Sequence, residues 1–144
     1  MVPVEVRGVR LERAEPSEPT EPAFLGSEDR TYVMLRSAEA SRALDIQIGS
    51  AEAFAISSAL EGKRWDRPMT HDLLGEVIAA LGATLRHVVI TDHREDDVYI
   101  AEMDLTDRDG GAIRVSARPS DVVALALRLG APILVNEAFF PNAA

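Results

Sequence analysis

A histidine and an aspartate lie side by side after an Arg-Pro pair, as His71-Asp72 following Arg67-Pro68. A histidine exchanges protons near neutral pH, and a carboxylate binds Mg²⁺ or Mn²⁺ through oxygen. These residue types predict acid–base or metal chemistry, with His71 and Asp72 as candidate catalytic residues. Neighbours on a helix project about 100° apart, so a shared site requires the first helical turn to open into a cleft. The alternative is that Asp72 caps the helix and His71 bonds a nearby backbone group.

A second Arg-Pro pair begins the segment Arg118-Pro119-Ser120-Asp121. A guanidinium binds phosphate through two parallel hydrogen bonds, and the free N–H groups of a helix start attract the same anion. Arg118 and Asp121 are therefore candidate catalytic residues, with Asp121 also a candidate metal ligand. We give equal weight to a structural alternative. In it, Arg118 forms an ion pair with Asp121 or with a glutamate, and this pair fixes the strand-to-helix turn.

Glu52 lies near the start of another predicted helix. Its simple role is to compensate the positive end of the helix dipole. Its functional role would be that of a third carboxylate, so Glu52, Asp72 and Asp121 form a candidate set of ligands for Mg²⁺ or Mn²⁺.

Other polar residues have structural interpretations that we favour. Glu102 and Asp104 share one strand face, where Glu102 is expected to lie opposite Arg114 as a cross-strand ion pair. Trp65 has the shape to stack on a nucleic-acid base, but packing over the helix entry is the preferred interpretation.

These residues need elements to position them, and hydrophobic periodicity predicts those elements. Helices are expected over 50–60, 70–81 and 119–129, and the second has one apolar face made by residues 73, 74, 77, 78 and 81. Strands are expected at 2–11 with a bulge at Gly8, and at 31–36, 42–48, 84–91, 98–105, 111–117 and 131–135. This order predicts an α+β fold with a mixed, largely antiparallel β-sheet and about three helices packed on it.

The chain is expected to form a single domain over residues 1–144, because 144 residues with 47% hydrophobic content suffice for one core. Residues 12–30 are rich in Pro, Glu and Ser, which predicts an exposed loop. Residues 136–140 are expected to make a final helical turn, and 139–144 a loose C-terminal end.

Composition excludes several classes of protein. The chain has no long apolar run, which predicts no membrane association, and no cysteine, which excludes disulfides and fits the cytoplasm. The net charge of −9 is unlike that of a generic nucleic-acid binder, although divalent metal would offset charge locally. No Walker loop, Gly-x-Gly-x-x-Gly, His-Glu-x-x-His or Gly-x-Ser-x-Gly motif occurs, which argues against common nucleotide, zinc-protease and hydrolase assignments. No cofactor other than Mg²⁺ or Mn²⁺ is expected.

Four motifs in order make the chain resemble the bifunctional nuclease domain family over roughly residues 2 to 138. They are Ile48-Gly49, Glu52-Ala53, Arg67-Pro68-Met69-Thr70-His71-Asp72 and Ala117-Arg118-Pro119-Ser120-Asp121. The resemblance implies metal-assisted cleavage of phosphodiester bonds in DNA and RNA. It directs attention to the matching positions Glu52, His71, Asp72, Arg118 and Asp121.

Two positions depart from the family pattern. Many members have tryptophan where this chain has Gln47, and many have aspartate where it has Ser116. Loss of the aromatic side chain would change a binding or dimer surface. Loss of the aspartate would weaken the site if that carboxylate holds metal, and would matter little if it only pairs with a basic side chain.

Two other functions compete with a nuclease. One is a non-catalytic, homodimeric binding or regulatory module, whose interface would be an edge strand or the apolar Phe139-Phe140 end. The other is a small-anion site at the two Arg-Pro helix entries, without turnover. A homodimer is the expected oligomeric state.

Overall fold

The computed structural model describes residues 1–13 and 29–141, and its elements follow the predicted order. Most of the loop expected at 12–30 lies outside the described residues. The strands and helices run as follows: β1 (Val2–Glu12), β2 (Arg30–Ser37), β3 (Ala43–Ile48), α1 (Ser50–Leu60), α2 (Thr70–Ala80), β4 (Thr84–His93), β5 (Tyr99–Thr106), β6 (Ala112–Ala117), α3 (Pro119–Leu129), β7 (Ile133–Val135) and the 3₁₀ turn Glu137–Phe139.

The strands form one seven-stranded sheet with the order β3-β2-β1-β7-β4-β5-β6. Only the pairing of β4 with β7 is parallel, so the sheet is mixed and largely antiparallel, as predicted. The expected bulge in β1 is present, because its register with β2 shifts between Val6 and Gly8. The α+β prediction is therefore confirmed.

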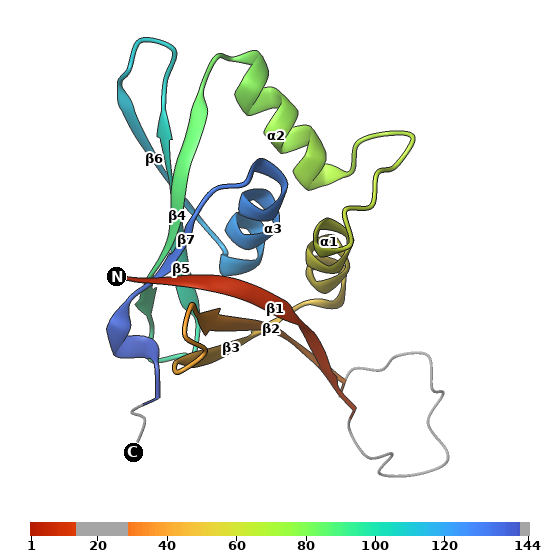
Figure 1. The fold of residues 1–144 in the computed structure, drawn as a ribbon, viewed down its shortest axis with the longest axis vertical. Coiled ribbons are helices and arrows are strands. Elements are labelled where there is room, and N and C mark those ends of the chain that lie inside the picture. Colours follow the sequence, from red (N-terminus) through yellow and green to blue (C-terminus); the bar gives the residue numbers. More distant parts are fainter. Residues whose placement is uncertain (14–28, 142–144) are drawn as a thin grey trace.

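Helix α3 is the centre of the packing. It contacts α1, α2, β4 and β5, whereas α1 covers β1 and β2, and Figure 1 shows the three helices on one side of the sheet. The apolar run after Asp121 explains this position, because Val123, Ala124 and Leu125 are fully buried. Pro119 occupies the first turn, where its missing N–H costs no helical hydrogen bond, and Gly130 ends the helix in the left-handed conformation at φ 68°. One core connects the helices and the sheet, so the described residues form a single domain.

Helix α2 turns only part of the predicted apolar face to the core, since Leu74 packs against the core and Ile78 is within it. Gly75 and Ile78 are buried, while Leu73, Val77 and Leu81 are exposed. The helix lies close to α3 at Gly75, where an added Cβ would be 3.1 Å from Leu129 Cδ2. This close approach turns Gly75 inward and leaves three apolar side chains on the outer surface.

The C-terminal segment is packed where the structure describes it. The helical turn expected at 136–140 is present as the 3₁₀ turn Glu137–Phe139. Of the end expected to be loose, Phe139 packs against the core and Phe140 is buried in it, while residues 142–144 lie outside the described part. Phe140 is therefore not available for the dimer interface suggested by the sequence. In the part of the chain that the structure describes, no helix has the length and apolarity needed to cross a membrane.

Candidate functional site

Ion pairs bring together the first turns of the three helices. Glu52 is the third residue of α1, His71 the second of α2 and Asp121 the third of α3, and Arg118 is the N-cap of α3. We call these four residues the Arg118 site. Each helix start carries partial positive charge from its free N–H groups, so acidic side chains or a bound anion are stabilised there.

The Arg118 guanidinium is held by two carboxylates. Its Nε and Nη2 donate to the two oxygens of Asp121 at 2.8 and 2.9 Å, and its Nη1 donates to Glu52 Oε1 at 3.0 Å. The hydrogen bonds to Asp121 and then to Glu52 raise the pKa of Arg118 above its ordinary value. The side chain is nonetheless 63% exposed, so these bonds orient a cation that remains accessible to a ligand.

Asp121 also binds the histidine. His71 Nε2 lies 3.1 Å from Asp121 Oδ1, and the His71 side chain is only 12% exposed. The hydrogen bond from Arg118 lowers the pKa of Asp121; burial opposes this effect and the bond to His71 adds to it. An ionised carboxylate only accepts hydrogen bonds, so the His71 Nε2–H donates and Nδ1 is left for another proton.

Asp72 points away from the Arg118 site. Its Oδ2 accepts from the Met69 backbone N–H at 3.0 Å, and its Oδ1 accepts from Arg128 Nε at 2.6 Å. Burial raises the pKa of Asp72, but the hydrogen bonds from Arg128 and Met69 outweigh it and the net shift is downward. The helix-capping alternative therefore describes Asp72, and His71 takes its carboxylate partner from α3 instead.

The predicted metal ligands do not fit a common site as they are arranged. Glu52 and Asp121 both bind the Arg118 guanidinium, which lies between them, and Asp72 binds Arg128. Across residues 1–13 and 29–141, no three histidine, aspartate or glutamate side chains are grouped as metal ligands would be. Carboxylate oxygens suit Mg²⁺ or Mn²⁺, but here these carboxylates form ion pairs with two arginines.

A cavity of about 570 Å³ lies beside Arg118. Its wall includes β3 with Gln47, the start of β5 with Tyr99, and the Glu52 and Arg118 side chains. Gln47, one of the two departures from the family pattern, thus lines a cavity at the candidate site. Ser116, the other departure, lies on β6 opposite Glu102.

The acidic pair on β5 forms a separate network. Arg114 lies directly opposite Asp104 in the register and binds it at 3.1 Å, while its distance to Glu102 is 3.7 Å. The expected Glu102–Arg114 pair is thus a diagonal contact, because the hairpin register places Ser116 opposite Glu102. His87 Nε2 also binds Asp104, at 2.6 Å.

The sequence reasoning missed Arg128. This side chain binds Asp72 and donates to the Ala124 and Ala55 carbonyls, so it joins α1, α2 and α3. Its position was visible in the sequence, because Arg128 is a basic residue in the last turn of an otherwise apolar helix.

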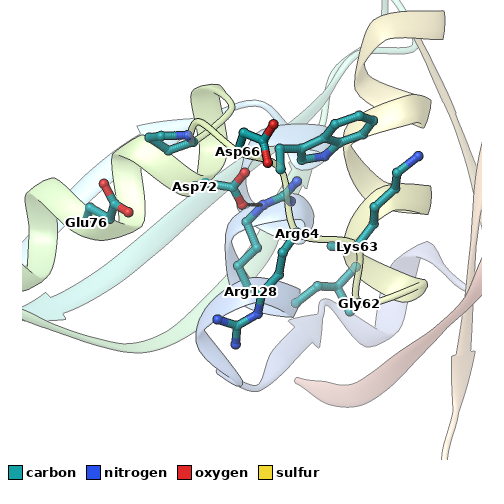
Figure 2. A pocket seen from close by; sticks show the side chains of 11 residues that line it. Gly62, Lys63, Arg64, Asp66, Asp72, Glu76 and Arg128 are labelled. Carbon is teal, nitrogen blue, oxygen red and sulfur yellow. Dashed lines mark hydrogen bonds and ion pairs between the residues drawn. The ribbon is translucent and has the colours of Figure 1, made fainter.

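A second cavity, of about 490 Å³, lies on the Asp72 side of α2. Figure 2 shows Lys63 and Arg64, from the loop that precedes α2, together with the Asp72–Arg128 pair around it. Trp65 is part of its wall and contacts Phe54 with a centroid distance of 5.8 Å.

Comparison with known proteins gives a family and two relatives. The model of the bifunctional nuclease domain matches residues 33–144. Two uncharacterized proteins of Mycobacterium tuberculosis, from strains CDC 1551 / Oshkosh and ATCC 25618 / H37Rv, are each 41% identical to the chain over 140 residues. The alignment covers 97% of this chain and 74% of each relative.

Proposed function

The chain belongs to the bifunctional nuclease domain family, and we propose that it cleaves phosphodiester bonds of DNA or RNA at the Arg118 site. One observation carries the proposal. A single carboxylate, Asp121, binds both the exposed Arg118 guanidinium and the His71 imidazole. A cation suited to phosphate and a group suited to proton transfer are thus held side by side.

Arg118 is proposed to bind the scissile phosphate. A guanidinium matches the oxygens of a phosphate geometrically and stabilises the negative charge that develops on them during displacement. Asp121 and Glu52 hold the Arg118 side chain in one orientation before substrate arrives. This preorganisation lowers the cost of ordering a long, exposed side chain.

His71 is proposed to transfer a proton at Nδ1. Its Nε2–H is bound to Asp121, and a carboxylate in that place orients the imidazole and stabilises its protonated form. Asp72 is a positioning residue under this proposal, because it caps α2 and anchors Arg128. Glu52, Asp72 and Asp121 do not form a common metal site as arranged. We therefore assign phosphate binding to Arg118 and proton transfer to His71, and no role to a bound metal.

The test is cleavage of single-stranded DNA and RNA in Mg²⁺, Mn²⁺ or EDTA. Arg118→Ala is expected to lower the rate by about 10²- to 10³-fold, the typical effect of losing one donor to a charged transition state. His71→Ala is expected to lower it by about 10²- to 10⁴-fold, as for loss of a general acid or base. The EDTA arm measures whether a divalent cation is required.

The matched control is Arg86→Ala, which removes an exposed arginine from β4. Its rate should equal that of the unaltered protein, and thermal unfolding should show that all variants are folded. Equal cleavage by the purified protein, Arg118→Ala and His71→Ala would contradict the proposal and identify a contaminating nuclease.

A second candidate function is a non-catalytic homodimeric module. The observation that favours it is the row of exposed apolar side chains made by Leu73 and Val77 on α2 and by its C-cap residue Leu81. Contiguous exposed apolar side chains are typical of protein interfaces. A stable dimer that cleaves neither nucleic acid would support this function over the first.

A further inference from the structure

We propose that the second cavity binds single-stranded nucleic acid, with a base stacked on Trp65 and backbone phosphates at Lys63 and Arg64. We call it the Trp65 cavity. The inference rests on the proposed function, since it assigns to the same substrate a binding site beyond the four residues of the Arg118 site.

The first support is the shape of the Trp65 cavity and what lines it. A volume of about 490 Å³ suits a small organic group such as a nucleotide. The 62–66 segment and the start of α2 form two of its sides, and the Arg128–Asp72 pair lies between them (Figure 2). Arg128 is fixed by bonds to three partners, so this part of the wall is preformed.

The second support is a group of cations that pair with no carboxylate in the described residues. Lys63, Arg64 and Arg67 form neither a hydrogen bond nor an ion pair with any residue in the described parts of the chain. Elsewhere in this acidic protein, arginines such as Arg36 and Arg42 are paired with carboxylates. Asp66 and Glu76 also line the cavity, but Lys63 and Arg64 have no carboxylate partner there and can therefore meet an anionic ligand.

The third support is an aromatic platform beside those cations. Trp65 is 37% exposed, packs against Phe54 with ring planes 42° apart, and has Lys63 Nζ 4.2 Å from its ring centroid. An accessible aromatic ring next to cations is the combination that single-stranded sites use, because bases stack on the ring while phosphates meet the cations. Packing of Trp65 over the loop and stacking on a base are thus compatible.

The Trp65 cavity also adjoins the Arg118 site. His71 and Asp72 are consecutive on α2, yet His71 binds Asp121 of the Arg118 site while Asp72 lines the Trp65 cavity. One strand bound past the first turn of α2 would contact both places. The Trp65 cavity would then hold a nucleotide next to the one that presents its phosphate to Arg118.

Binding can be measured without cleavage, because Trp65 is the only tryptophan in the chain. The probe is a phosphorothioate oligo(dT) of about ten nucleotides, a length within the range of single-strand sites. Stacking is expected to quench Trp65 fluorescence on titration at low salt. Inorganic phosphate and a DNA duplex of the same length are expected to quench it little.

Variants are compared by the anisotropy of a fluorescein-labelled oligo(dT). Trp65→Ala is expected to weaken binding by about tenfold to a hundredfold, and Trp65→Phe to retain most of it. The double variant Lys63→Gln, Arg64→Gln is expected to weaken binding and to reduce the slope of log K against log[salt] by about 1.4, or 0.7 for each phosphate contact. Arg86→Gln is the matched control and should bind as the unaltered protein does.

The two proposals fail in different ways. Quenching with the expected variant effects, but no cleavage, would support the Trp65 cavity and overturn the nuclease. Cleavage with unchanged Trp65 fluorescence, and with equal affinity in Lys63→Gln, Arg64→Gln, would overturn the Trp65 cavity and leave the nuclease standing. Equal competition by inorganic phosphate would also overturn it, because the cavity would then be a simple anion site.

Discussion

At the scale of residues, one carboxylate connects the groups from which we propose chemistry. Asp121 binds Arg118 through both oxygens and His71 through one of them. Glu52 accepts a hydrogen bond from the third guanidinium nitrogen, Nη1. A phosphate arriving at Arg118 would compete with these carboxylates for the same donors. Arg118 is therefore best placed to bind an anion with its outward N–H groups while its inner ones stay bound to Asp121.

The shifted pKa of Asp121 gives a prediction about acid stability. Its value lies below the ordinary one in the folded state, so the folded chain binds this proton more weakly than the unfolded chain does. The stability that Asp121 contributes is therefore present above the ordinary aspartate pKa and is lost as pH falls through the lower, folded value. Asp121→Asn removes this contribution.

The measurement is urea unfolding of both proteins between neutral pH and about pH 3, the lower end of the range where aspartates ordinarily titrate. We expect the unaltered protein to be the more stable at neutral pH, and the difference from Asp121→Asn to shrink toward the acid end. Asp109→Asn, in the exposed β5–β6 turn, is the control and should change the stability at neutral pH much less than Asp121→Asn does. A difference for Asp121→Asn that is independent of pH would contradict the prediction.

At the scale of elements, the Arg118 site depends on the residue that immediately precedes α1. Gly49 is the N-cap of this helix, with φ −72° and ψ 161°, a conformation open to any residue. A Cβ at position 49 would overlap the Glu52 carboxylate. The absence of a side chain at Gly49 thus leaves the space in which the Glu52 side chain folds back over the start of its own helix and binds Arg118.

Gly49→Ala is therefore expected to displace the Glu52 carboxylate without breaking the fold. The end of a glutamate side chain moves easily, so the loss of unfolding free energy should stay below about 1 kcal/mol, which includes the poorer N-cap propensity of alanine. A double-mutant cycle in urea tests the mechanism. Glu52→Ala should cost less in the Gly49→Ala background than alone, whereas additive costs would show that Gly49 does not act through Glu52.

At the scale of the whole molecule, the sheet brings distant parts of the chain around the Arg118 site. The cavity beside Arg118 has edge strand β3 on one side and the start of β5 on the other, although several strands separate them in the sheet order. The ion pair between Glu52 and Arg118 joins the start of α1 to the start of α3 at this cavity. The site is thus a product of the complete fold.

The exposed face of α2 gives a prediction about assembly. If Leu73 and Val77 lie in the interface of a homodimer, the protein at micromolar concentration should have twice the mass of one chain by light scattering. Leu73→Ser with Val77→Ser should then shift it to the monomer. Leu60→Ser, which alters an exposed apolar residue on α1, is the control and should leave the mass unchanged. A strict monomer, or a dimer unaffected by the α2 variants, would contradict this assembly.

Much of the fold was predictable because its signals are local. The bounds of α1 and α3 agree with the prediction, since apolar periodicity, the Pro119 start and the Gly130 end all act within a few residues. The inward face of α2 was predictable only in part, because Leu74 and Ile78 point to the core but Leu73 and Val77 do not. It depends on close contact between Gly75 and α3, and a glycine contributes nothing to a hydrophobic pattern.

By itself, the sequence determined the element types, their order and the presence of charged residues at three helix starts. Only the tertiary structure decided which charges meet. The contacts Glu52–Arg118, His71–Asp121 and Asp72–Arg128 join residues 66, 50 and 56 positions apart. Local patterns indicate where helices and strands form, but the partner of a charge depends on how helices are placed on a shared sheet. His71 and Asp72 are adjacent in the chain and face different partners for this reason.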